Sequence, residues 1–206
     1  MTEKGKLIIV SGPSGAGKST IVFRVMEGRD DLCFSTSVTT RAPRDGEVDG
    51  REYFFIDRER FCEMVENDEL LEHADYVKHS YGTPRAYVED RLREGMNVIL
   101  DIEIQGARQV LEKMPEAVAV FVIPPNIDVL RRRLTDRGTD LPEVVEARIR
   151  RAVQELQEAD FYDYLIVNND LDTAARQFEA ILLAEHCRFE PETVKAFLGG
   201  DSTHDL

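Results

Sequence analysis

Short runs of apolar and β-branched residues alternate along the chain with segments in which apolar residues return every three or four positions. The runs cover residues 6–10, 34–38, 97–102, 117–123 and 164–168. Such runs are typical of parallel strands that are buried on both faces. The helix-period segments cover residues 19–28, 84–95, 104–114, 126–138 and 173–189. The alternation predicts an α/β fold, with a parallel five-stranded core sheet covered by helices on both faces.

One region departs from this alternation. Between residues 35 and 84 the segments "DGEVDGREYFFID", "LLEHADYV" and "SYGT" predict short antiparallel strands joined by turns, which form an insertion on the sheet. The helix that follows is expected to have Thr83 as its N-cap, Pro84 at its first position and Gly95 just past its end.

Composition and charge narrow the class of protein. A chain of 206 residues with 42% apolar and 32% charged residues fits a single globular domain, which we expect to span residues 1–190, followed by a tail at 191–206 that carries no motif. The net charge of −14 argues against nucleic acid or an anionic membrane as the main partner. Homo-oligomerisation stays open.

The cysteines and the apolar runs predict a cytoplasmic location. Cys33, Cys62 and Cys187 are widely separated and lack metal-ligand spacing, so we interpret them as reduced thiols. The first strand is expected from residue 6, which leaves no room for a signal peptide, and the longest apolar run is too short to span a bilayer.

The stretch "SGPSGAGKST" at residues 11–20 lies between the first expected strand and the first expected helix. Gly12, Gly17, Lys18 and Ser19 fit the pattern G-x-x-x-x-G-K-[ST], in which glycines turn backbone N–H groups inward around phosphates. A dinucleotide fingerprint fits less well, because the glycines miss its spacing. We therefore expect a nucleoside triphosphate here, with Lys18 at the β- and γ-phosphates and Ser19 on Mg²⁺. The loop as a whole comprises Gly12, Pro13, Ser14, Gly15, Ala16, Gly17, Lys18, Ser19 and Thr20.

Two acids follow an apolar strand in "NVILDIE". Alternation along the strand places Asp101 and Glu103 on one face, at the end of the sheet where α/β proteins bind ligands. Asp101 is the candidate metal ligand, directly or through water. The alternative is that either acid, Glu103 above all, caps the next helix.

Arginines gather in two places in this acidic chain. Seven lie between residues 131 and 151, where a lid could project from the sheet. A lid that carries Arg133, Arg137 and Arg148 onto transferring phosphates would neutralise charge and exclude water. The alternative is a solvated helix face whose arginines pair with nearby glutamates, the candidates being Glu143, Glu146 and Glu155.

The second arginine cluster lies in the insertion. Arg41 and Arg44 flank a proline, so the backbone there is expected to be extended and both side chains could hold one anion. Tyr53 and Tyr81 add phenolic donors in the same region. A second anion site beside a triphosphate site predicts a phosphorylated acceptor.

These motifs, taken in order, resemble the guanylate kinase family of P-loop nucleoside monophosphate kinases. The resemblance covers about residues 6–188 and rests on "SGPSGAGKST", "SVTTRAPRDGEVDGREYFF", "LLEHADYVKHSYGT", "ILDIEIQG", "RRRLTDRGTD" and "LIVNND". It implies a core sheet with a small mixed α/β GMP-binding insertion at about 35–84 and a helical lid at about 126–151. Thr83 stands where some members have Ser, and Glu103 where some have Asp, so each position keeps its functional group.

The resemblance also implies roles for single residues. The GMP phosphate would lie on Arg41, Arg44, Tyr53 and Tyr81, the guanine on Ser37, Glu72 and Thr83, and Asp101 and Glu103 would complete the GMP site. Arg133, Arg137 and Asn168 would contact ATP. The catalytic set would be Lys18, Arg41, Asp101, Arg137 and Arg148.

The activity implied is phosphorylation of GMP, and of dGMP, to the diphosphate by direct in-line transfer from ATP with Mg²⁺, as part of purine nucleotide metabolism. The oxygen that attacks belongs to a phosphate already ionised near neutral pH, so no strong general base is needed. The alternative is a non-catalytic guanylate kinase-like module that binds proteins. The intact phosphate loop and guanine-contacting set favour the enzyme, and they also argue against a different P-loop kinase.

Overall fold

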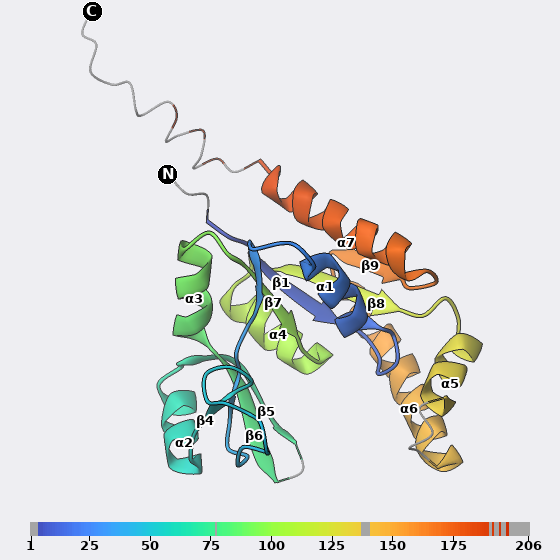
Figure 1. Ribbon diagram of the computed structural model, residues 1–206, viewed down its shortest axis with the longest axis horizontal. Coiled ribbons are helices and arrows are strands. Elements are labelled where there is room, and N and C mark those ends of the chain that lie inside the picture. Colours follow the sequence, from blue (N-terminus) through green and yellow to red (C-terminus); the bar gives the residue numbers. More distant parts are fainter. Residues whose placement is uncertain are drawn as a thin grey trace, which may run out of the picture.

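The computed structural model describes residues 4–76, 78–136, 141–189, 191, 194 and 197. Its larger sheet has five parallel strands (Figure 1). In spatial order they are β2 (Leu32–Phe34), β7 (Asn97–Asp101), β1 (Leu7–Ser11), β8 (Val118–Ile123) and β9 (Tyr164–Val167). The α/β fold expected from the alternating pattern is confirmed.

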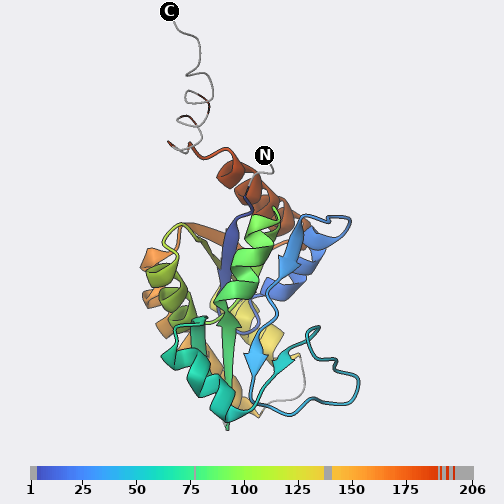
Figure 2. The same cartoon turned by 90° about the vertical axis from the view of Figure 1, so that its left-hand side faces the viewer.

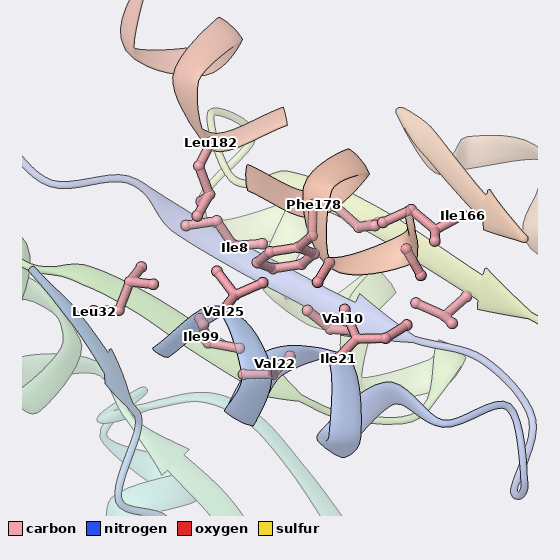
Figure 3. Packing of buried hydrophobic residues seen from close by; sticks show 14 of the residues in the cluster. Ile8, Val10, Ile21, Val22, Val25, Leu32, Ile99, Ile166, Phe178 and Leu182 are labelled. Carbon is pink, nitrogen blue, oxygen red and sulfur yellow. The ribbon is translucent and has the colours of Figure 1, made fainter. Parts of the chain in front are cut away.

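Helices cover both faces of this sheet. One face packs against α1 (Lys18–Met26) and α7 (Leu171–His186), and the other against α3 (Arg85–Arg93) and α4 (Ile104–Lys113). The central strand β1 packs against both helix layers because successive side chains point to opposite faces of the sheet. Ile8 and Val10 meet Phe178 of α7 on the first face (Figure 3), whereas Leu7 and Ile9 belong to the cluster on the second.

A second, mixed sheet lies at one end of the core sheet (Figures 1 and 2). Its order is β4 (Phe54–Phe55), β3 (Val38–Thr39), β6 (His79–Pro84) and β5 (Leu70–Tyr76), and α2 (Arg58–Glu66) packs on it. The pairs β3–β6 and β5–β6 are antiparallel, as the sequence predicts, but β3 and β4 pair in parallel. The residue pattern did not locate helix α2, although the family resemblance implied a mixed α/β insertion. The Asp57 carboxylate caps α2 by accepting from the Arg60 N–H at 2.8 Å.

Two further expectations are wrong in detail. The run at 34–38 is not one core strand: the chain leaves the core sheet after Phe34 and enters the second sheet at Val38. Thr83 does not cap α3, because Pro84 is the N-cap residue and the Thr83 hydroxyl donates elsewhere. Gly95 does follow the helix with φ 85°, a left-handed conformation that suits glycine.

The segment after β8 forms two helices that project beside the phosphate loop (Figure 1). They are α5 (Ile127–Thr135) and α6 (Pro142–Gln157), and they pack on each other through a small apolar cluster that includes Leu134 and Ile149. A short 3₁₀ turn, Ala159–Phe161, leads from α6 to β9. The predicted lid residue Arg137 lies outside the described residues.

Across the described ranges, every helix is too short or too polar to cross a membrane.

Candidate functional site

The phosphate loop joins the end of β1 to the start of α1. Gly12 and Gly17 have φ values of +141° and +91°, a region that favours glycine. A Cβ on Gly12 would overlap the carbonyl oxygen of Val122, and a Cβ on Gly17 would overlap the amide of Asn168. Both glycines are therefore required by backbone conformation and by space, which fixes the shape of the loop.

Three side chains meet where the loop enters α1. The Lys18 ammonium donates to the carbonyl oxygen of Gly12 at 2.8 Å and lies 3.7 Å from Oδ1 of Asp101. The Ser19 hydroxyl donates to Oδ2 of Asp101 at 2.9 Å. The end of β7 thus brings its carboxylate to the first turn of α1, and a fixed cation, a hydroxyl and a carboxylate share one point as the sequence predicts.

Two residues expected to contact ATP form hydrogen bonds to the backbone of the phosphate loop or beside it. The Asn168 amide, whose residue is 6% exposed, donates to the carbonyl oxygen of Ala16 at 2.8 Å. Arg133 donates to the same oxygen at 3.2 Å and to the backbone carbonyl of Asn168 at 2.9 Å. In this structure both side chains brace the phosphate loop.

A cavity of about 380 Å³ opens beside the loop. It brings the loop together with the end of β7, the arginine face of α6 and the tip of β5. Its lining consists of Gly12, Pro13, Ser14, Lys18, Tyr76, Asp101, Ile102, Glu103, Ile104, Arg148, Arg151, Ala152 and Glu155. Lys18, Asp101, Glu103 and Arg148 from the predicted set therefore share one pocket.

The sequence did not single out two residues of this lining, Arg151 and Tyr76. Arg151 donates to Glu103 at 2.7 Å and to Glu155 at 3.0 Å, and these carboxylates, Glu155 first, raise the pKa of its guanidinium. Glu103 occupies the N-cap position of α4, but its side chain makes no capping hydrogen bond. The arginine cluster was visible in the sequence, but which arginine faces the pocket depends on how α6 packs.

The charged face of the two projecting helices also forms ion pairs of the kind that the surface interpretation predicted. Arg131 pairs with Glu146, which joins α5 to α6, and Arg151 pairs with Glu155 within α6. The cluster is therefore divided between residues at the pocket and residues that hold the helix pair together.

The second arginine cluster forms a compact group in the second sheet. Both Arg41 Nη atoms donate to the Glu47 carboxylate at 2.9 Å, and the guanidinium lies over the ring of Tyr53, 5.4 Å from its centroid. The Tyr81 ring is 6.0 Å from that of Tyr53. The structure thus brings Arg41, Tyr53 and Tyr81 together as expected.

Glu47 also belongs to this group, although no sequence pattern singled it out. Its carboxylate also accepts the backbone N–H of Arg44 at 2.7 Å. Arg41 first, and then this N–H, hold the pKa of Glu47 below its ordinary value. The side chain of Arg44 is exposed. Glu47 lies in a turn six residues after Arg41, and turn residues follow neither the helix nor the strand period that would have identified it as a partner.

The predicted guanine contacts lie on β5 and β6 and next to β3. Glu72 is only 7% exposed, and its Oε1 accepts the Thr83 hydroxyl at 2.7 Å. Burial raises the pKa of Glu72, against the opposing effects of that hydrogen bond and of the Lys113 charge. Ser37 directly precedes β3, and the pairing of Val38 with Gly82 puts it opposite Thr83. A buried carboxylate with one oxygen already paired is thus held at the edge of the second sheet.

Comparisons with known proteins agree with this geometry. The guanylate kinase family model matches residues 4–185. A guanylate kinase from Carboxydothermus hydrogenoformans is 47% identical over 198 residues, which cover 96% of this chain and 97% of that protein. One from Lactococcus lactis is 46% identical over 190 residues, covering 92% and 93%.

A solved structure agrees as well. The crystal structure of guanylate kinase from Anaplasma phagocytophilum superposes with a TM-score of 0.69 at 35% identity, and covers 90% of this chain and 88% of that one. A matching family model, close relatives over nearly the whole length and a phosphate loop with its partners in place lead to one conclusion: the chain belongs to the guanylate kinase family.

Proposed function

We propose that this chain carries out the guanylate kinase reaction, transfer of the γ-phosphoryl group of ATP to GMP, in the cavity between the phosphate loop and α6, with the acceptor held by the second sheet. The observation that carries the proposal is the meeting of Lys18, Ser19 and Asp101 beside a pocket that Lys18, Asp101 and Arg148 line. A polyphosphate needs a cation, a helix N-terminus and a metal ligand set in one place.

On the ATP side, the loop at 12–20 binds the phosphates through its backbone, and Lys18 contacts the β- and γ-phosphates. The hydroxyl of Ser19 and the carboxylate of Asp101 are hard oxygen donors of the kind that Mg²⁺ prefers. Mg²⁺ held there, directly or through water, would neutralise charge on the phosphates. Arg133 and Asn168 support this site through the carbonyl of Ala16.

On the GMP side, the group of Arg41, Tyr53 and Tyr81, with Arg44 beside it, receives the phosphate. Glu47 holds Arg41 in place, and the remaining donors of the guanidinium bind the incoming dianion. Glu72, Thr83 and Ser37 receive the guanine: an ionised carboxylate accepts N1–H and the exocyclic amine, and the hydroxyl hydrogen of Thr83 turns from Glu72 to O6. Asp101 and Glu103 complete the acceptor site at the pocket.

The transfer step forms a bond between a GMP phosphate oxygen and the γ-phosphorus, and breaks the bond between that phosphorus and the oxygen bridging to the β-phosphate. The products are GDP and ADP. The attacking oxygen is ionised near pH 7, so the residues act by alignment and charge neutralisation rather than by proton abstraction. Lys18, Arg41, Asp101 and Arg148, with Arg137 from the lid, supply that function.

Several further points belong to the same proposal. Residues 1–190 form one domain, with the acceptor-binding insertion at 35–84 and the lid at 126–151, and dGMP is accepted as well as GMP. We place the chain in the cytoplasm, in keeping with three free cysteines.

The experiment is a coupled assay of ADP release over a panel of nucleoside monophosphates, with Mg²⁺ and with excess chelator. We expect efficient turnover with GMP and dGMP only, much weaker turnover with inosine monophosphate, and none in chelator. Equal rates with AMP would contradict the acceptor assignment, and full rates in chelator would contradict the metal assignment.

A further inference from the structure

Glu72 lies in an irregular part of an edge strand. In the order β4-β3-β6-β5 the strand β5 is at the margin of the second sheet. Its pairing with β6 shifts register between Leu70 and His73, and Glu72 lies inside that shift. A bulge leaves backbone groups without ladder partners and re-aims the side chain it carries. The direction of the Glu72 carboxylate therefore depends on whatever fixes the backbone here.

Helix α4 of the core supplies that support through Gln109. The half-buried amide of Gln109 accepts the N–H of His73 through Oε1 and donates through Nε2 to the carbonyl of the same residue, both at 3.1 Å. The N–H of His73 belongs to the peptide unit that carries the carbonyl of Glu72. One side chain thus acts as a neighbouring strand would, and it fixes the backbone orientation of Glu72.

Two other residues on the same face of α4 complete the arrangement, because positions three and four apart lie side by side on a helix. Lys113 donates to the carbonyl of Leu70 at 2.6 Å, at the other end of the register shift. At Gly106 an added Cβ would be 3.1 Å from Oε2 of Glu72, so the glycine leaves room for the carboxylate. Helix α4 therefore forms hydrogen bonds at both ends of the bulge and lies next to the Glu72 side chain.

We propose that Gln109 is a positioning residue for guanine selection, acting through Glu72. The inference rests on the proposed function of Glu72 as the residue that binds guanine. Guanine presents N1–H and an exocyclic amine side by side, and a carboxylate pairs with both only in one orientation. A displacement of the carboxylate by a fraction of an ångström weakens two hydrogen bonds together.

The test compares GMP with inosine monophosphate, which keeps N1–H and lacks the amine. Gln109→Ala, and the bulkier Gln109→Met in case the alanine variant folds poorly, should lower kcat/KM for GMP about tenfold, mostly through KM. For inosine monophosphate kcat/KM should fall about threefold or less, so the ratio of kcat/KM for GMP to that for inosine monophosphate becomes smaller. KM for ATP stays unchanged. Gln177→Ala, an exposed glutamine on α7, is the matched control and should change none of these values.

A double-mutant cycle separates positioning from general stability, since residues that act on one interaction are non-additive. In a Glu72→Ala background, Gln109→Ala should have little further effect on kcat/KM for GMP. The inference is wrong if the Gln109 variants lower kcat/KM equally for GMP and inosine monophosphate, or do not lower it at all. It is also wrong if Gln109→Ala lowers kcat/KM for GMP as much in the Glu72→Ala background as in wild type. If Glu72→Ala itself leaves the preference for GMP intact, the guanine assignment fails and the inference fails with it.

Discussion

The phosphate loop and the second sheet solve the same problem, binding a phosphorylated nucleotide, by different means. The loop uses backbone: glycines with positive φ, the first turn of α1 and two residues behind it that hold the carbonyl of Ala16. The second sheet uses side chains, which come from β5, from β6, from Ser37 just before β3 and from the turn around Arg41. A backbone site recognises phosphate in general, and a side-chain site can choose a base.

The two regions also differ in the core beneath them. Within the described residues, the two clusters against the core sheet contain sixteen and eleven buried apolar residues, and the cluster under the second sheet contains four. Regions with few buried contacts are the ones that open locally at low cost. The donor site is therefore held rigid by the core beneath it, whereas the acceptor site depends on hydrogen bonds from α4 and on ion pairs of its own.

The largest effect is expected when the donor site loses the cation at its phosphate loop. Lys18→Met should lower kcat by about three orders of magnitude or more, because the transferring phosphoryl group loses its nearest fixed cation. The melting temperature should hardly change, since Lys18 makes one hydrogen bond to the loop and one long ion pair. Turnover and thermal unfolding of the purified variant check this, and wild-type turnover would contradict the donor assignment.

The matching change on the acceptor side is Glu72→Ala. Two guanine hydrogen bonds and a buried partner of Thr83 are lost together, so kcat/KM for GMP should fall about a hundredfold or more. ATP binding, measured by titration with a non-hydrolysable analogue, should stay nearly unchanged. A variant that still uses GMP efficiently and still refuses AMP would show that another residue selects the base.

A smaller effect is expected where the acceptor site is preorganised. Glu47→Gln turns a two-bond contact with Arg41 into a single one, so KM for GMP should rise about three- to tenfold with kcat within about twofold. Steady-state kinetics at varied GMP measure it. A lower KM would mean instead that Glu47 competes with the GMP phosphate for Arg41.

The buried carboxylate of Glu72 should also lower the stability of the fold by an amount that depends on pH. Because burial raises the folded-state pKa of Glu72, the folded protein binds more protons than the unfolded chain, and its stability falls as pH rises through that pKa. Glu72→Gln removes this penalty. The variant should melt at a higher temperature than wild type at pH 7, by a margin that shrinks as pH approaches the ordinary glutamate value. Thermal scans from pH 4 to 8 test it, and a margin that grows on acidification would reverse the sign.

The smallest effect is expected outside both regions. Deleting residues 191–206 should leave kcat and KM within about twofold, because the family match ends at residue 185 and Phe197 is 83% exposed. Loss of soluble protein on truncation would show that this segment contributes to stability.

Sequence patterns succeeded where the physics is local. Apolar runs located the core strands, and the glycine spacing located the phosphate loop with Lys18 and Ser19, because strand burial and left-handed backbone depend on neighbouring residues. The same reasoning failed at residues 34–38, where one β-prone run is divided between two sheets. Helix α2 belongs to the mixed α/β insertion that the resemblance implied, but the residue pattern did not locate it, because its apolar stripe at Phe61 and Met64 is short.

The order of residues along the chain is therefore enough to predict the α/β core and the phosphate loop, and it shows which residue types are available for an acceptor site. How those residues are used depends on the way the elements pack. In the folded chain the Thr83 hydroxyl donates to Glu72 rather than capping a helix, and Arg41 donates to Glu47. Gln109 forms hydrogen bonds with the backbone at the bulge in β5. These partners lie 6 to 36 positions apart along the chain. The hydrogen bonds of Thr83 and Gln109 follow from how strands and helices pack, and that of Arg41 follows from the path of a turn. No local periodicity encodes any of them.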